Sequence, residues 1–213
     1  MIHQGQPVLS AGETLEKAKG VMIMAHGRGA SARDILGLAS EFTQPGFAYL
    51  APQAAGNSWW PQRFIDPIAS NEPELSSALQ VMGDLLKRVA GAGIPAERTM
   101  LLGFSQGACL VLEYVARNAK RYGGVAGLSG ALVGPEGTPR DYAGSLDGTP
   151  VFLGCSDVDF HISKARVLHT AEVLQKLGAQ VTTRLYPNME HTVSADELEF
   201  LSRMMGKVAE ASP

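Results

Sequence analysis

One serine of the sequence lies in a setting that could make it a nucleophile. Residues 103–107 read G-F-S-Q-G, a G-x-S-x-G pattern with Ser105 at its centre. The pattern alone is weak, but the apolar run TMLLGF precedes it and the helix-like segment GACLVLEYVA follows it. A sharp turn between a strand and a helix would expose the serine hydroxyl. We therefore predict that Ser105 is a nucleophile; a glycine-rich turn with a capping serine is the alternative.

Such a serine needs a base, usually a histidine that a carboxylate orients. His191 directly follows the last predicted strand and precedes a helix start, so we predict that it is the base. Asp157 lies nearest the end of the apolar run PVFLG and is the predicted acid, with Asp159 in reserve. His161 is predicted to line the pocket wall. The resulting order of nucleophile, acid and base is that of an α/β-hydrolase.

Attack on a carbonyl creates an oxyanion, which two backbone N–H groups could stabilise. The amide of Gln106 opens the helix after Ser105 and is the first predicted donor. The segment H-G-R-G at 26–29 follows the apolar run VMIMA, and we predict that the Arg28 amide is the second donor. His26 is expected to bond to local backbone. A plain tight turn is the alternative interpretation of this segment.

A long stretch without clear periodicity, residues 52–70, is expected to line the site, because compact domains seldom contain such loops otherwise. Its aromatic residues Trp59, Trp60 and Phe64, with Phe160 opposite and His161, are the predicted substrate-binding walls. Ordinary packing is the alternative for the two tryptophans. About twenty residues separate the runs GVAGL and PVFLG, which leaves no room for a helical cap.

The composition is that of an ordinary folded chain. It has 213 residues, 45% hydrophobic and 18% charged, with a net charge of −3, which excludes disorder and a basic nucleic-acid-binding stripe. Two cysteines are too few for a disulfide scaffold. No signal peptide, stable membrane insertion, zinc spacing or phosphate-binding loop is recognisable, so we expect a cytoplasmic protein without metal or cofactor.

Apolar strand-length runs alternate with segments of helical periodicity. This alternation predicts an α/β fold with a mostly parallel, doubly wound sheet flanked by helices, in one domain spanning residues 1–213. Asn71 is the expected cap of the helix that follows the long loop, and Ser31 with Asp34 and Ser194 with Glu197 have capping-box spacing. The predicted strands are 21–25, 47–51, 99–104, 124–128, 150–154 and 180–186, and helices are expected from about 31, 71, 106, 163 and 194.

The chain resembles the phospholipase/carboxylesterase family of α/β-hydrolases, which includes acyl-protein thioesterases and small bacterial carboxylesterases. The resemblance rests on AHGRGASARDI, APQAAGNSWWPQRF, GFSQGA, and GCSDVDFHI with YPNMEHT. It implies the α/β-hydrolase fold without a cap domain, the triad of Ser105, Asp157 and His191, and oxyanion amides from Arg28 and Gln106. The chain departs from the family pattern in the pair after His-Gly, after the acid and before the final histidine.

The predicted function is hydrolysis of carboxylic esters with short to medium acyl groups or small aromatic groups, through an acyl-enzyme. The predicted partner is a small-molecule ester, with no nucleic acid; a homodimer is left open. A thioesterase or lysophospholipase using the same triad is the first alternative, and an inactive hydrolase scaffold that only binds is the second. A lactone hydrolase ranks lower, because the dienelactone hydrolases usually have cysteine at the position of Ser105.

Overall fold

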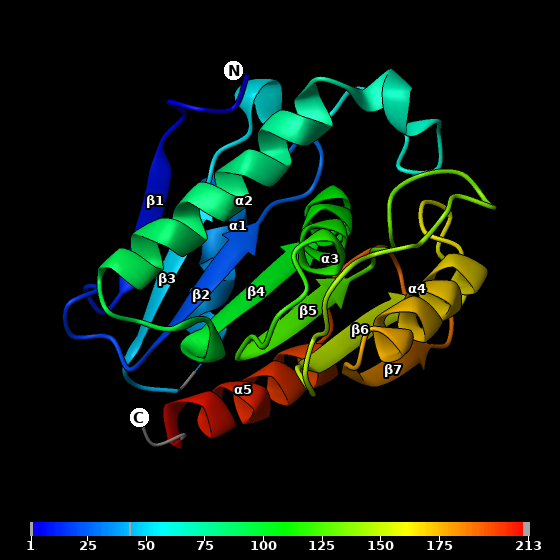
Figure 1. The fold of residues 1–213 in the computed structure, drawn as a ribbon. Helices are drawn as coiled ribbons and strands as arrows, with labels where there is room; N and C mark the ends of the chain where they lie inside the picture. The colour runs from blue at the N-terminus through cyan, green and yellow to red at the C-terminus, as the bar shows by residue number, and fades with distance from the viewer. Residues whose placement is uncertain (1, 43, 211–213) are drawn as a thin grey trace.

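A computed structural model describes residues 2–42 and 44–210 (Figure 1). In this part of the chain, seven strands form one sheet in the order β1-β3-β2-β4-β5-β6-β7. Only the pairing of β1 with β3 is antiparallel. The strands are β1 (Val8–Gly12), β2 (Gly20–Ala25), β3 (Phe47–Pro52), β4 (Thr99–Phe104), β5 (Gly124–Leu128), β6 (Pro150–Ser156) and β7 (Gln180–Tyr186).

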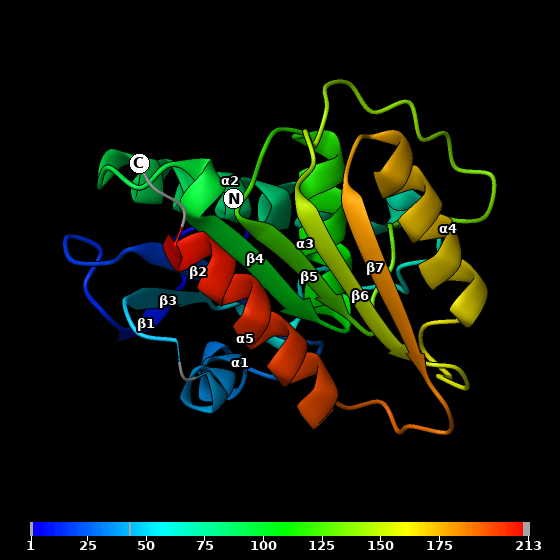
Figure 2. The same cartoon turned by 90° about the horizontal axis from the view of Figure 1, so that it is seen from below.

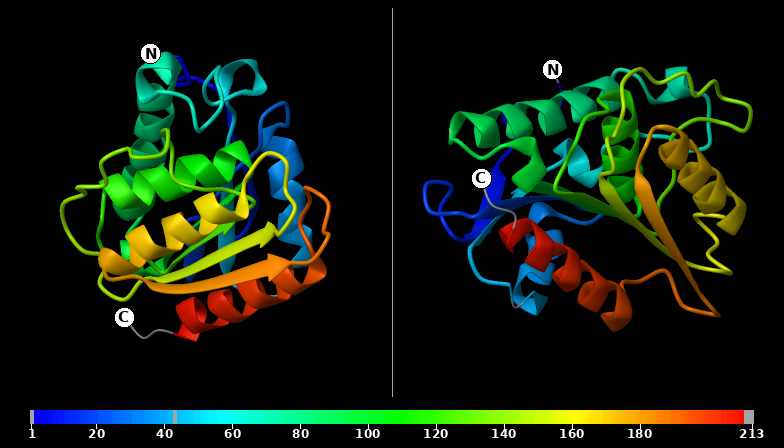
Figure 3. Two further views of the ribbon diagram at one scale, coloured as in Figure 1. Left: turned by 90° about the vertical axis from the view of Figure 1, so that its right-hand side faces the viewer. Right: turned by 60° about the horizontal axis from the view of Figure 1, so that its bottom comes forward.

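Five α-helices of the described residues cover the two faces of the sheet (Figures 2 and 3). One apolar cluster joins the sheet to α2, α3 and α4, and a second joins its other face to α1 and α5. Both faces are therefore buried, which explains why the central strands are continuous apolar runs. The helices are α1 (Ala32–Leu36), α2 (Glu74–Gly91), α3 (Gln106–Arg117), α4 (Lys164–Lys176) and α5 (Ala195–Glu210).

The predicted α/β-hydrolase architecture is confirmed, and the two expected capping boxes form, at α1 and α5. Ser31 and Asp34 form a complete capping box at α1. At α5, the Glu197 carboxylate accepts hydrogen bonds from the Ser194 N–H and hydroxyl, and the Glu197 N–H donates to the Ser194 hydroxyl. Residues 129–149, between β5 and β6, contain no helix or strand longer than an isolated bridge, so no cap domain is inserted there.

Two features of the fold differ from the predictions. The edge strand β1 was not expected, because its short, half-buried sequence VLSAG has little apolar patterning. The prediction that Asn71 caps the next helix is wrong: α2 begins after Pro73. Asn71 is instead fully buried in the preceding loop, where its side chain accepts from the Gln62 N–H and donates to the Arg63 carbonyl.

Parallel strands end on the same side of the sheet, where their arrowheads point in Figure 1. Loops that follow β2, β4, β6 and β7 therefore meet at one edge, as ligand-binding loops do in open α/β sheets. Within residues 2–42 and 44–210, no helix combines the length and the apolar character that crossing a membrane would need.

Candidate active site

Ser105 lies in a strained turn between β4 and α3. Its backbone has φ of 54° and ψ of −119°, an unusual conformation for a residue other than glycine. The flanking glycines make the turn sterically feasible: a Cβ on Gly103 would lie 2.2 Å from the Gly107 carbonyl oxygen, and a Cβ on Gly107 would lie 2.1 Å from that of Ala25. The turn therefore requires both glycines of the G-x-S-x-G pattern.

His191 reaches Ser105 from the loop after β7. Its Nε2 lies 2.9 Å from the Ser105 hydroxyl oxygen, although 86 positions separate the two residues. Its Nδ1 lies 2.6 Å from Oδ2 of Asp159. The imidazole also lies close to the rings of Phe104 and His161. The structure thus connects a hydroxyl, an imidazole and a carboxylate in one continuous chain of hydrogen bonds.

The Asp159 side chain is fully buried behind this imidazole. Its second oxygen, Oδ1, accepts hydrogen bonds from the His161 N–H at 2.8 Å and from the Ile162 N–H at 2.9 Å. Burial alone would raise the pKa of Asp159, but the bonds from His191, Ile162 and His161 outweigh it and lower the pKa from its usual value. The group is therefore a carboxylate at neutral pH.

The prediction that Asp157 orients the histidine is wrong. Asp157 still continues the pairing of β6 with β7, because its N–H donates to the Tyr186 carbonyl. Its exposed carboxylate accepts from the Asn188 N–H at 2.9 Å, in the loop that leads to His191. The chain turns toward the imidazole only after this point, so the reserve candidate, Asp159, supplies the contact.

The loop after β2 lies directly against Ser105. A Cβ on Gly27 would lie 3.4 Å from the Cβ of Ser105. His26 is buried behind this loop, where its Nε2 accepts from the Ala54 N–H and its Nδ1 therefore donates to the Gly27 carbonyl. Burial lowers the pKa of His26, which favours the neutral ring. The oxyanion role of the Arg28 and Gln106 amides stays a prediction.

The side chain of Gln106 braces the pocket wall. Its Oε1 accepts from the Trp59 N–H at 2.9 Å, and its Nε2 donates to the Trp60 carbonyl at 2.9 Å. Both partners are backbone groups, so the Gln106 side chain fixes the aromatic loop to the start of α3. Sequence reasoning predicted a role only for its backbone amide.

A cavity of about 380 Å³ opens beside Ser105. Three of the predicted wall residues, Trp60, Phe64 and His161, line it. Trp59 does not: its ring lies beside His26, and its indole N–H donates to the His26 carbonyl. Phe160 does not either: its side chain projects into solvent and is 94% exposed. The complete lining is Arg28, Trp60, Pro61, Gln62, Arg63, Phe64, Ser105, Gln106, Cys109, His161, Ile162 and His191.

Sequence reasoning missed several of these lining residues. Cys109 lies one helical turn after Ser105, and this spacing could have placed it beneath the nucleophile. Pro61, Gln62 and Arg63 belong to the long loop that was predicted to line the site. The sequence of a loop does not show which of its side chains face a cavity. Ile162 is buried by the turn at Asp159, which could not be foreseen.

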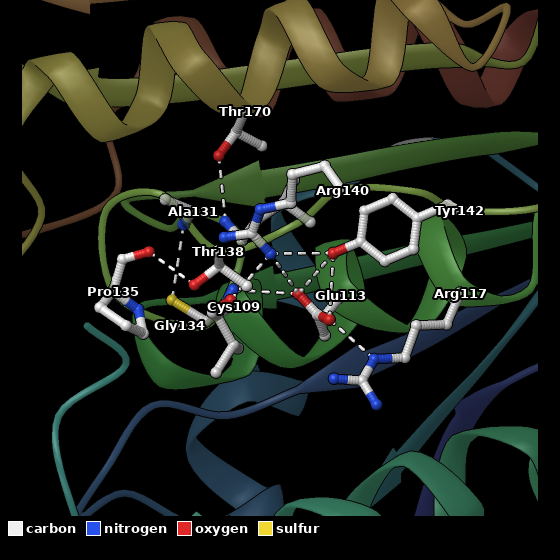
Figure 4. Close-up of polar contacts among 12 residues, drawn as sticks. Cys109, Glu113, Arg117, Ala131, Gly134, Pro135, Thr138, Arg140, Tyr142 and Thr170 are labelled. Atoms are coloured by element: carbon white, nitrogen blue, oxygen red, sulfur yellow. Dashed lines mark hydrogen bonds and ion pairs between the residues drawn. The ribbon is translucent and has the colours of Figure 1, made fainter. Parts of the chain in front are cut away.

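A buried polar network centred on Glu113 lies farther along α3 (Figure 4). Glu113 is almost fully buried, and its carboxylate accepts from Arg117, from the Tyr142 hydroxyl and from the Val133 N–H. Arg140 lies 3.5 Å from the same carboxylate and donates to the Val133 carbonyl. The network thus ties the helix that begins after Ser105 to the segment between β5 and β6.

That segment supports the pocket wall in turn. The Gly134 N–H donates to the Phe64 carbonyl at 2.7 Å. Arg166 of α4 donates to the carbonyls of Leu132 and Gly134 and lies over the Phe64 ring, 5.5 Å from its centroid. The position of Phe64 is therefore fixed by contacts from two other parts of the chain.

Both cysteines are buried, as predicted. The Cys155 sulfur lies 3.8 Å from Oδ2 of Asp159, and burial together with this carboxylate raises the pKa of the thiol to about 12. Burial raises the pKa of Cys109 to about 12 as well. In the described part of the chain, no group of three or more His, Cys, Asp or Glu side chains is arranged to hold a metal ion.

Comparison with known proteins identifies the family and the fold of the chain. Residues 10–209 match the model of the phospholipase/carboxylesterase family. A crystal structure of a phospholipase/carboxylesterase from Dyadobacter fermentans is 38% identical, with a TM-score of 0.92 over 96% of this chain and 98% of that chain.

Acyl-protein thioesterase 1 of Kluyveromyces lactis is 28% identical over 90% of this chain and 93% of that protein. Acyl-protein thioesterase 1 of Debaryomyces hansenii is 36% identical over 49% of this chain. The match spans 46% of the length of the Debaryomyces protein, and 55% and 63% of its counterparts in Neurospora crassa and Gibberella zeae. The chain therefore belongs to the phospholipase/carboxylesterase family and has the α/β-hydrolase fold.

Proposed function

We propose that the protein hydrolyses carboxylic esters in two acyl-transfer steps, with Ser105 as nucleophile, His191 as base and Asp159 as the acid that orients it. The observation that carries this proposal is the hydrogen-bond chain from the Ser105 hydroxyl through both ring nitrogens of His191 to a buried carboxylate. Family membership and relatives named as carboxylesterases support it.

In the first step, the Ser105 oxygen attacks the carbonyl carbon while Nε2 of His191 takes the hydroxyl proton. Asp159 accepts from Nδ1–H, so it holds the required tautomer and stabilises the imidazolium. The Arg28 and Gln106 N–H groups donate hydrogen bonds to the negatively charged oxygen of the tetrahedral intermediate. His191 then returns its proton to the departing alcohol, and an acyl-Ser105 ester remains.

In the second step, His191 removes a proton from a water molecule, which attacks the acyl carbon. The tetrahedral intermediate collapses, the acid product leaves, and the proton returns to Ser105. These steps need no group other than the side chains and amides already named.

The substrate is proposed to carry a short to medium acyl group or a small aromatic group. The pocket combines the apolar surfaces of Trp60, Phe64 and Ile162 with a volume of about 380 Å³, near the lower end for small-molecule sites. Relatives named as acyl-protein thioesterases favour thioesters as a second substrate class for the same triad.

Turnover of p-nitrophenyl butyrate by the Ser105→Ala variant tests the proposal. We expect kcat to fall by at least a factor of about 10⁴, because no nucleophile remains. Ser76→Ala, at an exposed position of α2, is the matched control and should retain full activity. Retained turnover in Ser105→Ala would refute the assignment, and a panel of oxygen esters and acyl-CoA compounds would separate ester from thioester preference.

A further inference from the structure

The pocket beside Ser105 has an uneven charge. Two arginines, Arg28 and Arg63, line it together with His161 and His191. Among the described residues, no aspartate or glutamate belongs to the lining; Asp159 is fully buried behind the imidazole. A cleft lined by one sign of charge concentrates ligands of the opposite sign.

Arg28 is held in place without losing its charge. One Nη donates to the Pro61 carbonyl at 2.7 Å, and the other to the Gln62 carbonyl at 2.5 Å. Both acceptors are neutral, and a guanidinium has five N–H groups, so three remain for a ligand. The Gly29 N–H also donates to the Asn57 carbonyl, which fixes the adjoining backbone.

Neither arginine of the pocket forms an ion pair within residues 2–42 and 44–210. Other arginines of the fold do, as with Arg117 and Arg140 at Glu113 and Arg184 at Asp196. The pocket arginines thus differ from these three in lacking a carboxylate partner.

Their position relative to the reaction is close. Arg28 belongs to the loop whose Gly27 packs against Ser105, and Arg63 lies in the wall segment between Gln62 and Phe64. Both cations line the same cavity as Ser105, so an anionic group of an ester bound there would lie in a positively charged surrounding. Apolar carbons of the same ester would contact Trp60 and Ile162.

We infer that the pocket selects esters or thioesters that carry an anionic group, a carboxylate or a phosphate, in addition to the bond that is cleaved. This inference rests on the proposed function and specifies its substrate class. Guanidinium groups bind both anions through charge-assisted hydrogen bonds. One such bond raises kcat/KM by about tenfold or more over a neutral ester of the same size.

Pairs of esters with equal carbon skeletons test the inference, and two arms locate the anion. Monoethyl adipate against ethyl hexanoate places a carboxylate on the acyl side. The butyrate ester of 2-hydroxyethyl phosphate against ethyl butyrate places a phosphate on the alcohol side. We expect kcat/KM for the anionic ester to be at least about tenfold higher in one arm, and the preference to shrink as salt rises.

Variants assign the preference to the two arginines. Arg28→Gln should reduce the ratio of anionic to neutral kcat/KM, and Arg28→Lys should restore part of it. Because Arg28 also braces the wall, Arg63→Gln provides a second variant, in which the ratio should likewise fall. Lys87→Gln removes the same unit charge from an exposed site of α2 and should leave the ratio unchanged.

Equal kcat/KM for both members of each pair would overturn the inference, as would a preference that survives both Arg28→Gln and Arg63→Gln. The two proposals fail in different ways. If ethyl hexanoate is cleaved with dependence on Ser105 but without anionic preference, only this inference is wrong. If no ester is cleaved, or if cleavage persists in Ser105→Ala, the proposed function itself is wrong.

Discussion

The imidazole of His191 binds the second acidic residue after β6, not the first: its Nδ1 lies 2.6 Å from Oδ2 of Asp159. Asp157 instead accepts the Asn188 N–H. The two carboxylates lie two positions apart on one loop, yet only one is buried against the ring. Their neutral variants should therefore differ sharply in activity.

We predict that Asp159→Asn lowers kcat for p-nitrophenyl butyrate by about 10⁴-fold, because an amide in this place favours the wrong imidazole tautomer. Asp157→Asn keeps an oxygen that can accept the Asn188 N–H, so its kcat should stay close to that of the parent. Steady-state kinetics on both variants decides the matter. Equal losses in the two variants would contradict the assignment of Asp159.

Much of this site could be predicted from the sequence, because long apolar runs fix the sheet and the ends of parallel strands meet at one edge. The nucleophile follows from its two glycines, and the base follows from its place after β7. The sequence could not show which of Asp157 and Asp159 contacts the histidine. Distance from a strand end does not reveal where a loop turns, and β6 keeps its pairing with β7 as far as Asp157.

The aromatic residues show a similar limit. Their residue type and place in the loops predicted that Trp59 and Phe160 line the pocket. Trp59 is instead buried in the core, and Phe160 projects into solvent. Adjacent positions of an extended loop point in different directions, so Trp60 lines the pocket and Trp59 does not. The strand β1 lacked a pattern because it is only five residues long and none of them is fully buried.

We predict that Gln106→Ala affects catalysis mainly through the pocket wall. The variant keeps its backbone amide but loses the bonds to the Trp59 N–H and the Trp60 carbonyl. Each buried group left unpaired costs about 1–3 kcal/mol, so the wall should move and KM should rise. Kinetics against a series of acyl lengths measures this change; an unchanged KM across the series would contradict the bracing role.

The network at Glu113 should be essential for stability. Glu113→Ala leaves Arg140 buried without its carboxylate, and we expect a loss of about 3–5 kcal/mol in the free energy of unfolding. Glu199→Ala is the matched control, because Glu199 forms an exposed i,i+4 ion pair with Arg203 on α5. Its loss should stay below about 1 kcal/mol. Urea unfolding compares them, and similar losses would argue against the network.

The carboxyl of Glu197 should make stability depend on pH. It is fully buried, its Oε1 has no hydrogen-bond partner among residues 2–42 and 44–210, and burial raises its pKa above the usual value. The folded chain therefore binds a proton more tightly than the unfolded chain does. Stability from this group is greatest when the group is protonated and falls as pH rises from its unfolded pKa through the raised folded pKa.

Glu197→Gln removes this titration while keeping an oxygen for the Ser194 N–H. The free energy of unfolding of Glu197→Gln, relative to that of the parent, should increase as pH rises from about 4 to 8. Glu199→Gln, an exposed carboxyl on the same helix, serves as the control. Parallel curves for the parent and Glu197→Gln would show that burial of this carboxyl does not affect stability.

The central claim is that Ser105 becomes covalently bound to the reacting group, and labelling tests it directly. After treatment with a fluorophosphonate, intact-protein and peptide mass spectrometry should find one adduct, on the peptide that contains Ser105. Folded Ser105→Ala should remain unlabelled under the same conditions. An adduct at another residue, or equal labelling of the variant, would contradict the account.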